Sequence, residues 1–410
     1  MDLDAYRARA QAFATDLNRA HHRRFAGHDG LWDPESLYAF HAAAFDDAAI
    51  DALREAAAAD PAARRLLRFA IEARLSSVTA RTDAERARAE STGHLAELTA
   101  DLAEGPDLAR RIALEEARLD VVARHLTPLA AEGLERVRAE VRVLGWPSPR
   151  ALLATLHGRD PGALAAEAEA LLRATEAPAL DGDGEPVTAR ADLPRVHRAA
   201  WADPLLPEDP VAALRAGLGA LDLDDRGFAL DAVPRPGKSP RAFCAAIEVP
   251  SDIHLVVAPR GGLSDLEALF HEAGHAVFLA HRDPRAPFEE RHLTDPADAE
   301  ALAFALEDRA TAGIEDERLA RHRAAMGRLR ARHLAATLLH GLDLLDAGPH
   351  PSLRERYARR MANATGLLWP SAPWLVSADP LLSSADYLRA LARARRLGDD
   401  AAALRQALTG

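Results

Sequence analysis

The amino-acid sequence predicts a mainly α-helical, bilobed protein with a small antiparallel β-sheet placed directly before one distinctive helix. Three observations predict this fold. The chain is rich in Ala, Leu and Arg, and aromatic residues make up 5% of it, a mixture that favours helix over strand. Apolar residues recur with helical spacing over most of the chain. Short apolar stretches separated by turn residues are concentrated between residues 228 and 258.

The chain from Asp4 to about Thr175 is predicted to form successive amphipathic helices. One apolar face of these helices is formed by Leu66, Leu67, Phe69, Ala70 and Leu75. Pro and Gly residues end or begin helices. They predict breaks at Gly30–Pro34, Asp60-Pro61, Gly105-Pro106, Trp146-Pro147 and Asp160-Pro161-Gly162.

The polar, turn-rich segment Ala179–Val187 is the predicted boundary between two lobes. We therefore expect a helical N-terminal lobe over residues 1–185 and a second lobe, which contains the small sheet and the distinctive helix, over residues 186–410. The second lobe should begin with two helices, near Arg190–Ala202 and Pro210–Leu221. Three strands should follow, and helical spacing returns after Gly261-Gly262. The predicted strands are Phe228–Val233, Arg241–Val249 and Ile253–Ala258.

Composition and charge exclude several classes of protein. The chain has 410 residues, of which 48% are hydrophobic, so it can bury a large core. Its net charge of −12 argues against nucleic acid as a partner. No apolar run approaches the roughly 18–20 residues that span a membrane. The chain has a single cysteine, Cys244, and its first residues lack the pattern of a secretory signal, so we expect a cytoplasmic protein. The sequence does not determine the oligomeric state.

The sequence His271-Glu272-Ala273-Gly274-His275 carries the strongest chemical signal. Two histidines four residues apart lie on one face of a helix, so their imidazoles can bind a single zinc ion. Glu272 is rotated by about 100° from His271, where it can reach a water on the metal without being a ligand. The alternative interpretation is a pair of hydrogen-bonded core histidines.

A third ligand is predicted on the next helix. Glu300 follows His271 by 29 residues, and Asp295-Pro296 is a typical helix start just before it. Two imidazoles and one carboxylate leave the fourth position of a zinc ion open, as catalytic zinc requires. Glu267 and Glu307 lie one or two helical turns from these predicted ligands. Either residue is a candidate to hydrogen-bond a ligand imidazole, and an ordinary surface position is the alternative for both.

Several segments together resemble the thimet oligopeptidase and oligoendopeptidase F family of zinc metallopeptidases. The family has a G-K-x-x-x-A-F element, then strands, then H-E-x-G-H, then a ligand glutamate in a following helix. The corresponding residues are Gly237-Lys238, Ala242-Phe243, His271–His275 with Gly274, and Glu300. The resemblance implies a helical peptidase acting on short peptides, in which His271, His275 and Glu300 hold one zinc ion and Glu272 acts on the water. Family members are commonly longer than this chain.

The family also carries a tyrosine-rich segment that stabilises the oxyanion. The resembling stretch here, Pro380–Tyr387, retains one tyrosine, so Tyr387 is the expected oxyanion donor. Tyr357 and His350 are weaker candidates for contacts with substrate.

The mechanism expected from the residues needs no covalent intermediate. Zinc lowers the pKa of its water, Glu272 accepts the proton as the water attacks the peptide carbonyl, and the proton passes to the leaving amine. The peptide is expected to pair with an exposed sheet edge, at Ala245 and Ala246 in one strand or in the strand Ile253–Ala258.

Two other functions fit the same sequence. A metallocarboxypeptidase would need a cation for the terminal carboxylate of its substrate, and Arg241, Arg260 and Lys238 are available. A zinc-containing peptide-binding module without significant hydrolysis would fit the loss of the other tyrosines.

Overall fold

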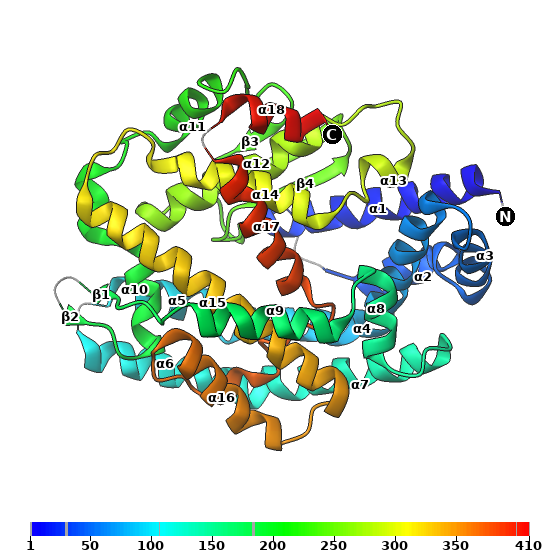
Figure 1. The fold of residues 1–410 in the computed structure, drawn as a ribbon, viewed down its shortest axis with the longest axis horizontal. Coiled ribbons are helices and arrows are strands. Elements are labelled where there is room, and N and C mark those ends of the chain that lie inside the picture. The colour runs from blue at the N-terminus through cyan, green and yellow to red at the C-terminus, as the bar shows by residue number, and fades with distance from the viewer. Residues whose placement is uncertain (1, 29–31, 106, 183–184, 399, 410) are drawn as a thin grey trace. The chain divides into compact units, whose positions relative to one another are not determined.

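The computed structural model describes residues 2–28, 32–105, 107–182, 185–398 and 400–409 (Figure 1). It is predominantly helical, as predicted. The helices are α1 (Leu3–Phe25), α2 (Pro34–Phe40), α3 (Asp47–Ala57), α4 (Pro61–Thr92), α5 (Leu95–Glu104), α6 (Leu108–Val121), α7 (Thr127–Val143), α8 (Pro149–His157), α9 (Pro161–Ala174), α10 (Leu193–Arg198), α11 (Pro210–Gly219), α12 (Leu263–Ala280), α13 (Phe288–Arg291), α14 (Pro296–Asp308), α15 (Glu317–Ala347), α16 (Ser352–Thr365), α17 (Ser383–Leu397) and α18 (Ala401–Thr409). The strands are β1 (Asp181–Gly182), β2 (Glu185–Pro186), β3 (Ala229–Asp231), β4 (Phe243–Glu248) and β5 (Asp252–Val256).

The predicted proline breaks lie at helix starts or within two residues of them. Helices α4, α8 and α9 each begin at a proline, where the missing N–H costs no helical hydrogen bond. Ser148 and Asp160 precede two of these prolines, and their side chains accept hydrogen bonds from backbone N–H groups of the first turn. Parts of three predicted features, residues 29–31, 106 and 183–184, lie outside the described residues.

The helix predicted over residues 190–202 is shorter than expected. Helix α10 occupies its centre, with 3₁₀ turns at Arg190–Asp192 and Ala200–Leu205. Ala199 adopts a left-handed conformation with φ of 48°, and an α-helix does not continue through such a residue.

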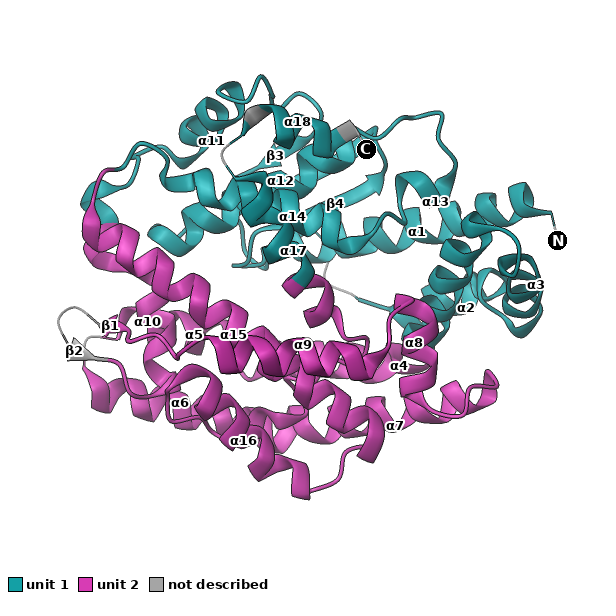
Figure 2. Cartoon of the chain, in the orientation of Figure 1, with its two compact units in different colours: residues 1–77, 203–314, 389–410 teal, residues 78–202, 315–388 magenta. Residues whose placement is uncertain are grey.

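The chain forms two compact units (Figure 2). Unit 1 contains residues 1–77, 203–314 and 389–410, and unit 2 contains residues 78–202 and 315–388. The predicted boundary between residues 185 and 186 is not a division between these units. Each unit combines segments that are distant in sequence, and helices α4 and α17 contribute residues to both.

Unit 1 contains a three-stranded sheet with the strand order β3-β5-β4. Strands β4 and β5 pair antiparallel, as predicted, with Cys244 opposite Leu255. Strand β3 pairs parallel to β5, so the prediction of a wholly antiparallel sheet was wrong. After β3 the chain crosses to the opposite edge of the sheet and forms β4. The hairpin then returns the chain to the centre as β5, which runs parallel to β3.

Unit 2 is built from helices around apolar clusters. One cluster includes Leu344, Tyr357, Met361 and Trp374, all buried. Tyr357 is 1% exposed, and its hydroxyl accepts a hydrogen bond of 3.0 Å from the indole Nε1 of Trp369. No helix among the described residues has the length and hydropathy to cross a bilayer.

A buried ion pair joins the first helix of unit 1 to α13. The carboxylate of Glu289 is 0% exposed, and the guanidinium of Arg7 donates three hydrogen bonds to it, at 2.6, 2.9 and 3.2 Å. Burial raises the pKa of Glu289, but the hydrogen bonds from Arg7 outweigh it and hold the pKa below its usual range.

Replacing Arg7 by Met would leave this buried carboxylate without its cation. We expect the free energy of unfolding at pH 7 to fall by about 2 kcal/mol, because Arg7 is itself partly exposed. A carboxyl group with a lowered pKa stabilises the fold above its unfolded pKa and loses this effect in acid. The difference between wild type and Arg7→Met should therefore shrink below about pH 4.

Urea denaturation at pH 7 and pH 3.5 measures this difference. Arg19→Met is the matched control on α1, because Arg19 pairs with the half-exposed Asp16 and should contribute less than about 1 kcal/mol. Equal stability of Arg7→Met and Arg19→Met would contradict the role given to the buried pair.

Candidate metal centre

The chain enters α12 through a turn that requires glycine. Gly261 and Gly262 have φ of 92° and 93°, a conformation that other residues rarely adopt. The carboxylate of Asp265, in the first turn of α12, accepts hydrogen bonds from the N–H groups of Arg260 and Gly261, the second at 3.0 Å. This turn fixes the point at which α12 begins, directly after the sheet.

Helix α12 is held by an apolar face. It packs against β4 and β5 and, more extensively, against α14. The buried residues on it include the predicted stripe of Leu266, Leu269, Phe270, Ala273 and Val277. His271 and His275 lie beside this stripe, partly exposed, so their imidazoles are accessible while the helix is anchored in the core.

Helix α14 begins where the sequence predicted. Pro296 is its first residue, and Asp295 caps it by accepting a hydrogen bond of 3.0 Å from the N–H of Ala297. Arg389 and Arg393, from the part of α17 in unit 1, form ion pairs with the same Asp295 carboxylate. This cluster holds the first turn of α14, and Glu300 lies one turn further along.

Gly274 allows α12 and α14 to approach closely. A Cβ atom at this position would lie 2.6 Å from the Cα of Ala303, a distance that real contacts do not show. Ala303 itself is 0% exposed and belongs to the packed face of α14. The glycine of the motif is therefore required by packing, because it sets the spacing between the helix of the two histidines and the helix of Glu300.

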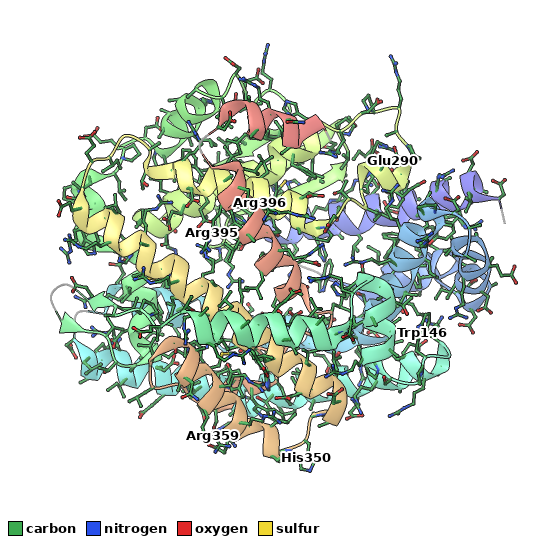
Figure 3. The ribbon with its side chains drawn as sticks, in the orientation of Figure 1. Trp146, Glu290, His350, Arg359, Arg395 and Arg396 are labelled. Atoms are coloured by element: carbon green, nitrogen blue, oxygen red, sulfur yellow. The ribbon has the colours of Figure 1, made fainter. Side chains whose placement is uncertain are left out.

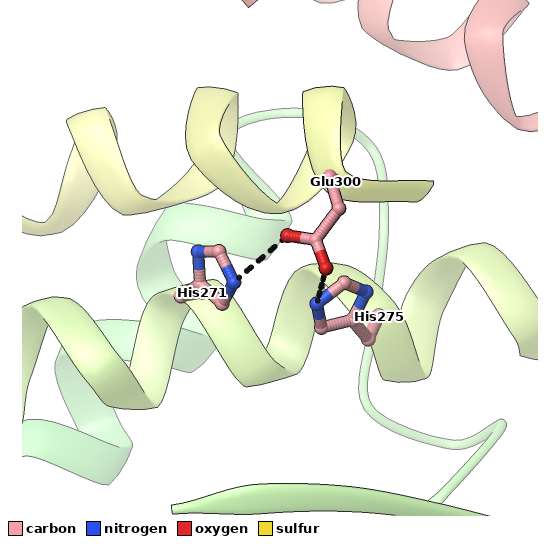
Figure 4. A group of neighbouring side chains, drawn as sticks. All are labelled: His271, His275 and Glu300. Carbon is pink, nitrogen blue, oxygen red and sulfur yellow. Dashed lines mark ion pairs between the residues drawn. The ribbon is translucent and has the colours of Figure 1, made fainter. Parts of the chain in front are cut away.

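The three predicted ligands converge (Figure 4). The carboxylate of Glu300 reaches between the two imidazoles, with Oε2 3.4 Å from Nε2 of His271 and Oε1 3.6 Å from Nε2 of His275. One ligand atom from each residue lies within 4.8 Å of the others. Two imidazole nitrogens and a carboxylate oxygen at this spacing fit the donor set of a divalent transition metal such as zinc.

The electrostatic surroundings differ between the two histidines. Burial lowers the pKa of His275 to about 4, so its imidazole is neutral at pH 7, the form in which histidine binds metals. Burial also lowers the pKa of His271, but hydrogen bonds to Glu300 and Glu307 outweigh it and raise the pKa to about 9. Metal binding would therefore displace a proton that His271 shares with these carboxylates.

Glu307 supports the imidazole of His271 from behind. Its Oε2 lies 2.9 Å from Nδ1 of His271, on the opposite side of the ring from Nε2. A carboxylate in this position orients the ring and makes Nε2 a better ligand. Sequence reasoning left open whether Glu307 contacts a histidine or lies at the surface; its place two turns after Glu300 on the same helix was the available signal.

Glu272 contacts the sheet. Its Oε2 accepts a hydrogen bond of 2.9 Å from the backbone N–H of Cys244 in β4. Burial raises the pKa of Glu272. A carboxylate with a raised pKa, next to the candidate ligand His271, has the properties of a general base.

Strand β4 forms one edge of the sheet, whereas β5 lies between its two neighbours. Of the two strands predicted to pair with substrate, β5 is therefore excluded. On β4, Ala245 is buried, and the carbonyl of Ala246 accepts a hydrogen bond of 2.7 Å from Asn18 of α1. A peptide that pairs with β4 must exchange some of these contacts for its own.

The other predicted substrate residues lie in unit 2. Tyr357 is enclosed in the core described above, which removes it as a substrate contact. His350 is exposed after α15, with Nδ1 2.7 Å from the hydroxyl of Ser352 (Figure 3). Tyr387 is half-buried on α17, in unit 2, and the metal ligands are in unit 1. Its assignment as oxyanion donor stays a prediction.

Lys238 has a structural role. Its side chain is 1% exposed, and Nζ donates hydrogen bonds to the carbonyls of Asp231 and Val233 and to the carboxylate of Asp231, at 2.8–3.0 Å. An ammonium group has three donors, and these bonds use all of them. Lys238 therefore has no donor left for a substrate carboxylate, whereas Arg241 and Arg260 are exposed.

Comparisons with known proteins place the fold. No protein-family model and no curated protein matches the chain. Among solved structures, PZ peptidase A with an inhibitor aligns over 97% of this chain and 84% of its own, with a TM-score of 0.64 and 13% identity. A structure described as an oligoendopeptidase F aligns over 100% and 90%, with a TM-score of 0.59 and 14% identity. Another so described, from Bacillus anthracis str. Ames, aligns over 98% and 83%, with a TM-score of 0.57 and 14% identity.

These similarities establish the fold of the chain. The helix-rich fold that the sequence predicts is therefore one that these solved structures share. Because one fold can serve several functions, the activity has to be argued from the site.

The close approach at Gly274 gives the first test of the site. Gly274→Ala should force α12 and α14 apart, lowering the free energy of unfolding by about 1–3 kcal/mol and weakening zinc binding. Gly327→Ala is the matched control, because Gly327 lies inside α15 with no atom within 4 Å of an added Cβ, and should stabilise by about 0.5–1 kcal/mol. Thermal and urea denaturation measure both, and wild-type stability of Gly274→Ala would refute the packing argument.

The contact behind His271 gives the second test. Glu307→Ala removes the partner of Nδ1 and should weaken zinc binding about 10–100-fold, while Glu307→Gln, which keeps an acceptor, should weaken it less. Competition with a chromophoric chelator measures the affinity. Asp308→Ala removes the same charge from the next, exposed residue and should leave affinity near wild type. If Glu307→Ala is folded and binds zinc with unchanged affinity, Glu307 does not support His271 as a ligand.

Proposed function

We propose that this chain is a zinc-dependent peptidase that hydrolyses peptide bonds in short peptides. The observation that carries the proposal is the convergence of His271, His275 and Glu300, with the half-buried carboxylate of Glu272 one residue from His271. The similarity of the fold to PZ peptidase A and to oligoendopeptidase F structures supports the reaction class.

His271, His275 and Glu300 would hold the ion. When bound, zinc supplies a Lewis acid that polarises a carbonyl and makes water a nucleophile near neutral pH. The remaining chemistry belongs to the side chains around it. Glu307 keeps the His271 ring oriented, and the packing at Gly274 keeps Glu300 between the imidazoles.

Glu272 moves the proton. Its Oε2 is held by the N–H of Cys244, which leaves Oε1 to accept a proton from the attacking water. The raised pKa of this half-buried carboxylate improves it as a base and allows it to pass the proton on to the leaving amine. No nucleophilic side chain is needed, and the thiol of Cys244, whose pKa burial raises, is unsuited to be one.

The peptide would bind in extended form along β4. An edge strand offers backbone groups to an added strand, and β4 is the edge that carries the contact to Glu272. Tyr387 is the proposed donor to the oxyanion, on its family resemblance. An alternative is carboxypeptidase action, in which Arg241 or Arg260 would bind the terminal carboxylate, since Lys238 is occupied within its own turn.

The direct test is Glu272→Gln, assayed on a library of short fluorogenic peptides. The variant should retain one zinc per chain, because Glu272 is not a ligand, and its kcat should fall about 10²–10⁴-fold. Glu290→Gln, an exposed carboxylate on α13 (Figure 3), is the control and should keep full activity.

Each outcome distinguishes a function. Equal activity of wild type and Glu272→Gln would remove Glu272 from the mechanism. No cleavage by zinc-loaded wild type would favour a peptide-binding module. Release of single C-terminal residues, identified by mass spectrometry, would favour the carboxypeptidase.

A further inference from the structure

Unit 2 contains a cavity that the proposed peptidase activity does not use. It has a volume of about 500 Å³ and lies among α9, α15 and α16. Five arginines line it, whereas Glu169 is the single carboxylate in its lining among the described residues. In a chain with a net charge of −12, so positive a cavity is a local exception.

Arg332 is the buried cation of this cavity. It is 6% exposed and lies on α15. Its Nε donates to the carbonyl of Ala364 at 2.6 Å and its two terminal nitrogens donate to oxygens of Leu172, Thr175 and Asn363. All of these acceptors are neutral. The guanidinium is therefore fixed by neutral acceptors, and the nearby carboxylate of Glu176 acts on its charge through space, without a hydrogen bond or ion pair to it.

Helix α16 presents the other cations on one face. Arg359 and Arg360 follow Arg356 by three and four residues, so their side chains lie one turn from that of Arg356. Arg356 and Arg360 share one carboxylate, Asp343, at 3.2 and 2.6 Å. Arg359, which extends from the surface in Figure 3, forms no ion pair within the part of the chain that the structure describes.

Three carboxylates near the cavity, those of Glu169, Glu176 and Asp343, are too few to balance its five arginines. Glu169 lies 3.3 Å from Arg173, and both side chains are largely exposed. Asp343 serves two arginines at once, and the side chain of Arg356 remains 55% exposed. Arg356 and Arg359 are thus exposed cations of the lining, and Arg332 is its buried cation.

We infer that this cavity binds a small phosphate-bearing anion. A guanidinium offers paired N–H donors that match two phosphate oxygens, and several guanidiniums around one cavity are the usual protein site for multiply charged phosphate. The volume falls within the range of sites for small molecules. Leu172, Leu339 and Ala364 add an apolar wall that an organic group attached to the phosphate would contact.

The probe for this site is inorganic pyrophosphate, titrated into the full-length protein by isothermal calorimetry. We expect one binding site per chain, with an affinity that weakens as salt is raised, because the contacts are electrostatic. The double variant Arg356→Gln/Arg359→Gln should weaken binding at least about tenfold, since each charge-assisted hydrogen bond contributes strongly.

The control removes the same charge elsewhere. Arg395→Gln/Arg396→Gln changes two exposed arginines on α17 (Figure 3), outside the cavity, and should bind pyrophosphate as the wild type does. Circular dichroism confirms that both variants are folded. Absence of pyrophosphate binding to wild type, or equal weakening in both double variants, would overturn the inference. Zinc content and peptide cleavage are read separately, so failure here leaves the peptidase proposal untouched.

Discussion

The candidate site depends on one packing contact, the approach of α12 to α14 at Gly274 and Ala303. The two imidazoles belong to one helix and the carboxylate to the other, so the distance between the helices decides whether a single ion can meet all three. A methyl group on Gly274 would lie 2.6 Å from the Cα of Ala303. The spacing of the ligands is therefore set by steric contact between two helices, before any metal is bound.

The elements around this contact restrict it further. Asp265 and the two glycines before it fix the start of α12, and Asp295 fixes the start of α14. Glu307 holds the outer nitrogen of His271, and the N–H of Cys244 holds Glu272. Of the two carboxylates that raise the pKa of His271, Glu300 would also face a cation, so metal binding would displace a proton from this histidine.

The sequence predicted the parts of this arrangement that depend on local pattern. The spacing of His271 and His275, the Asp-Pro start before Glu300 and the three apolar stretches each correspond to an observed element, because periodicity and capping act over a few residues. Contacts between distant segments were not predictable in this way. The parallel pairing of β3, the discontinuous units and the enclosure of Tyr357 and Lys238 depend on tertiary packing, which a short pattern does not contain.

The central claim is that His271, His275 and Glu300 bind one ion. Zinc-edge X-ray absorption of the zinc-loaded protein tests it most directly. We expect one zinc per chain, with two imidazole nitrogens at about 2.0–2.1 Å and further oxygen ligands. We also expect Glu300→Ala to lose stoichiometric zinc. A coordination shell without imidazole, or full zinc retention by Glu300→Ala with an unchanged shell, would contradict it.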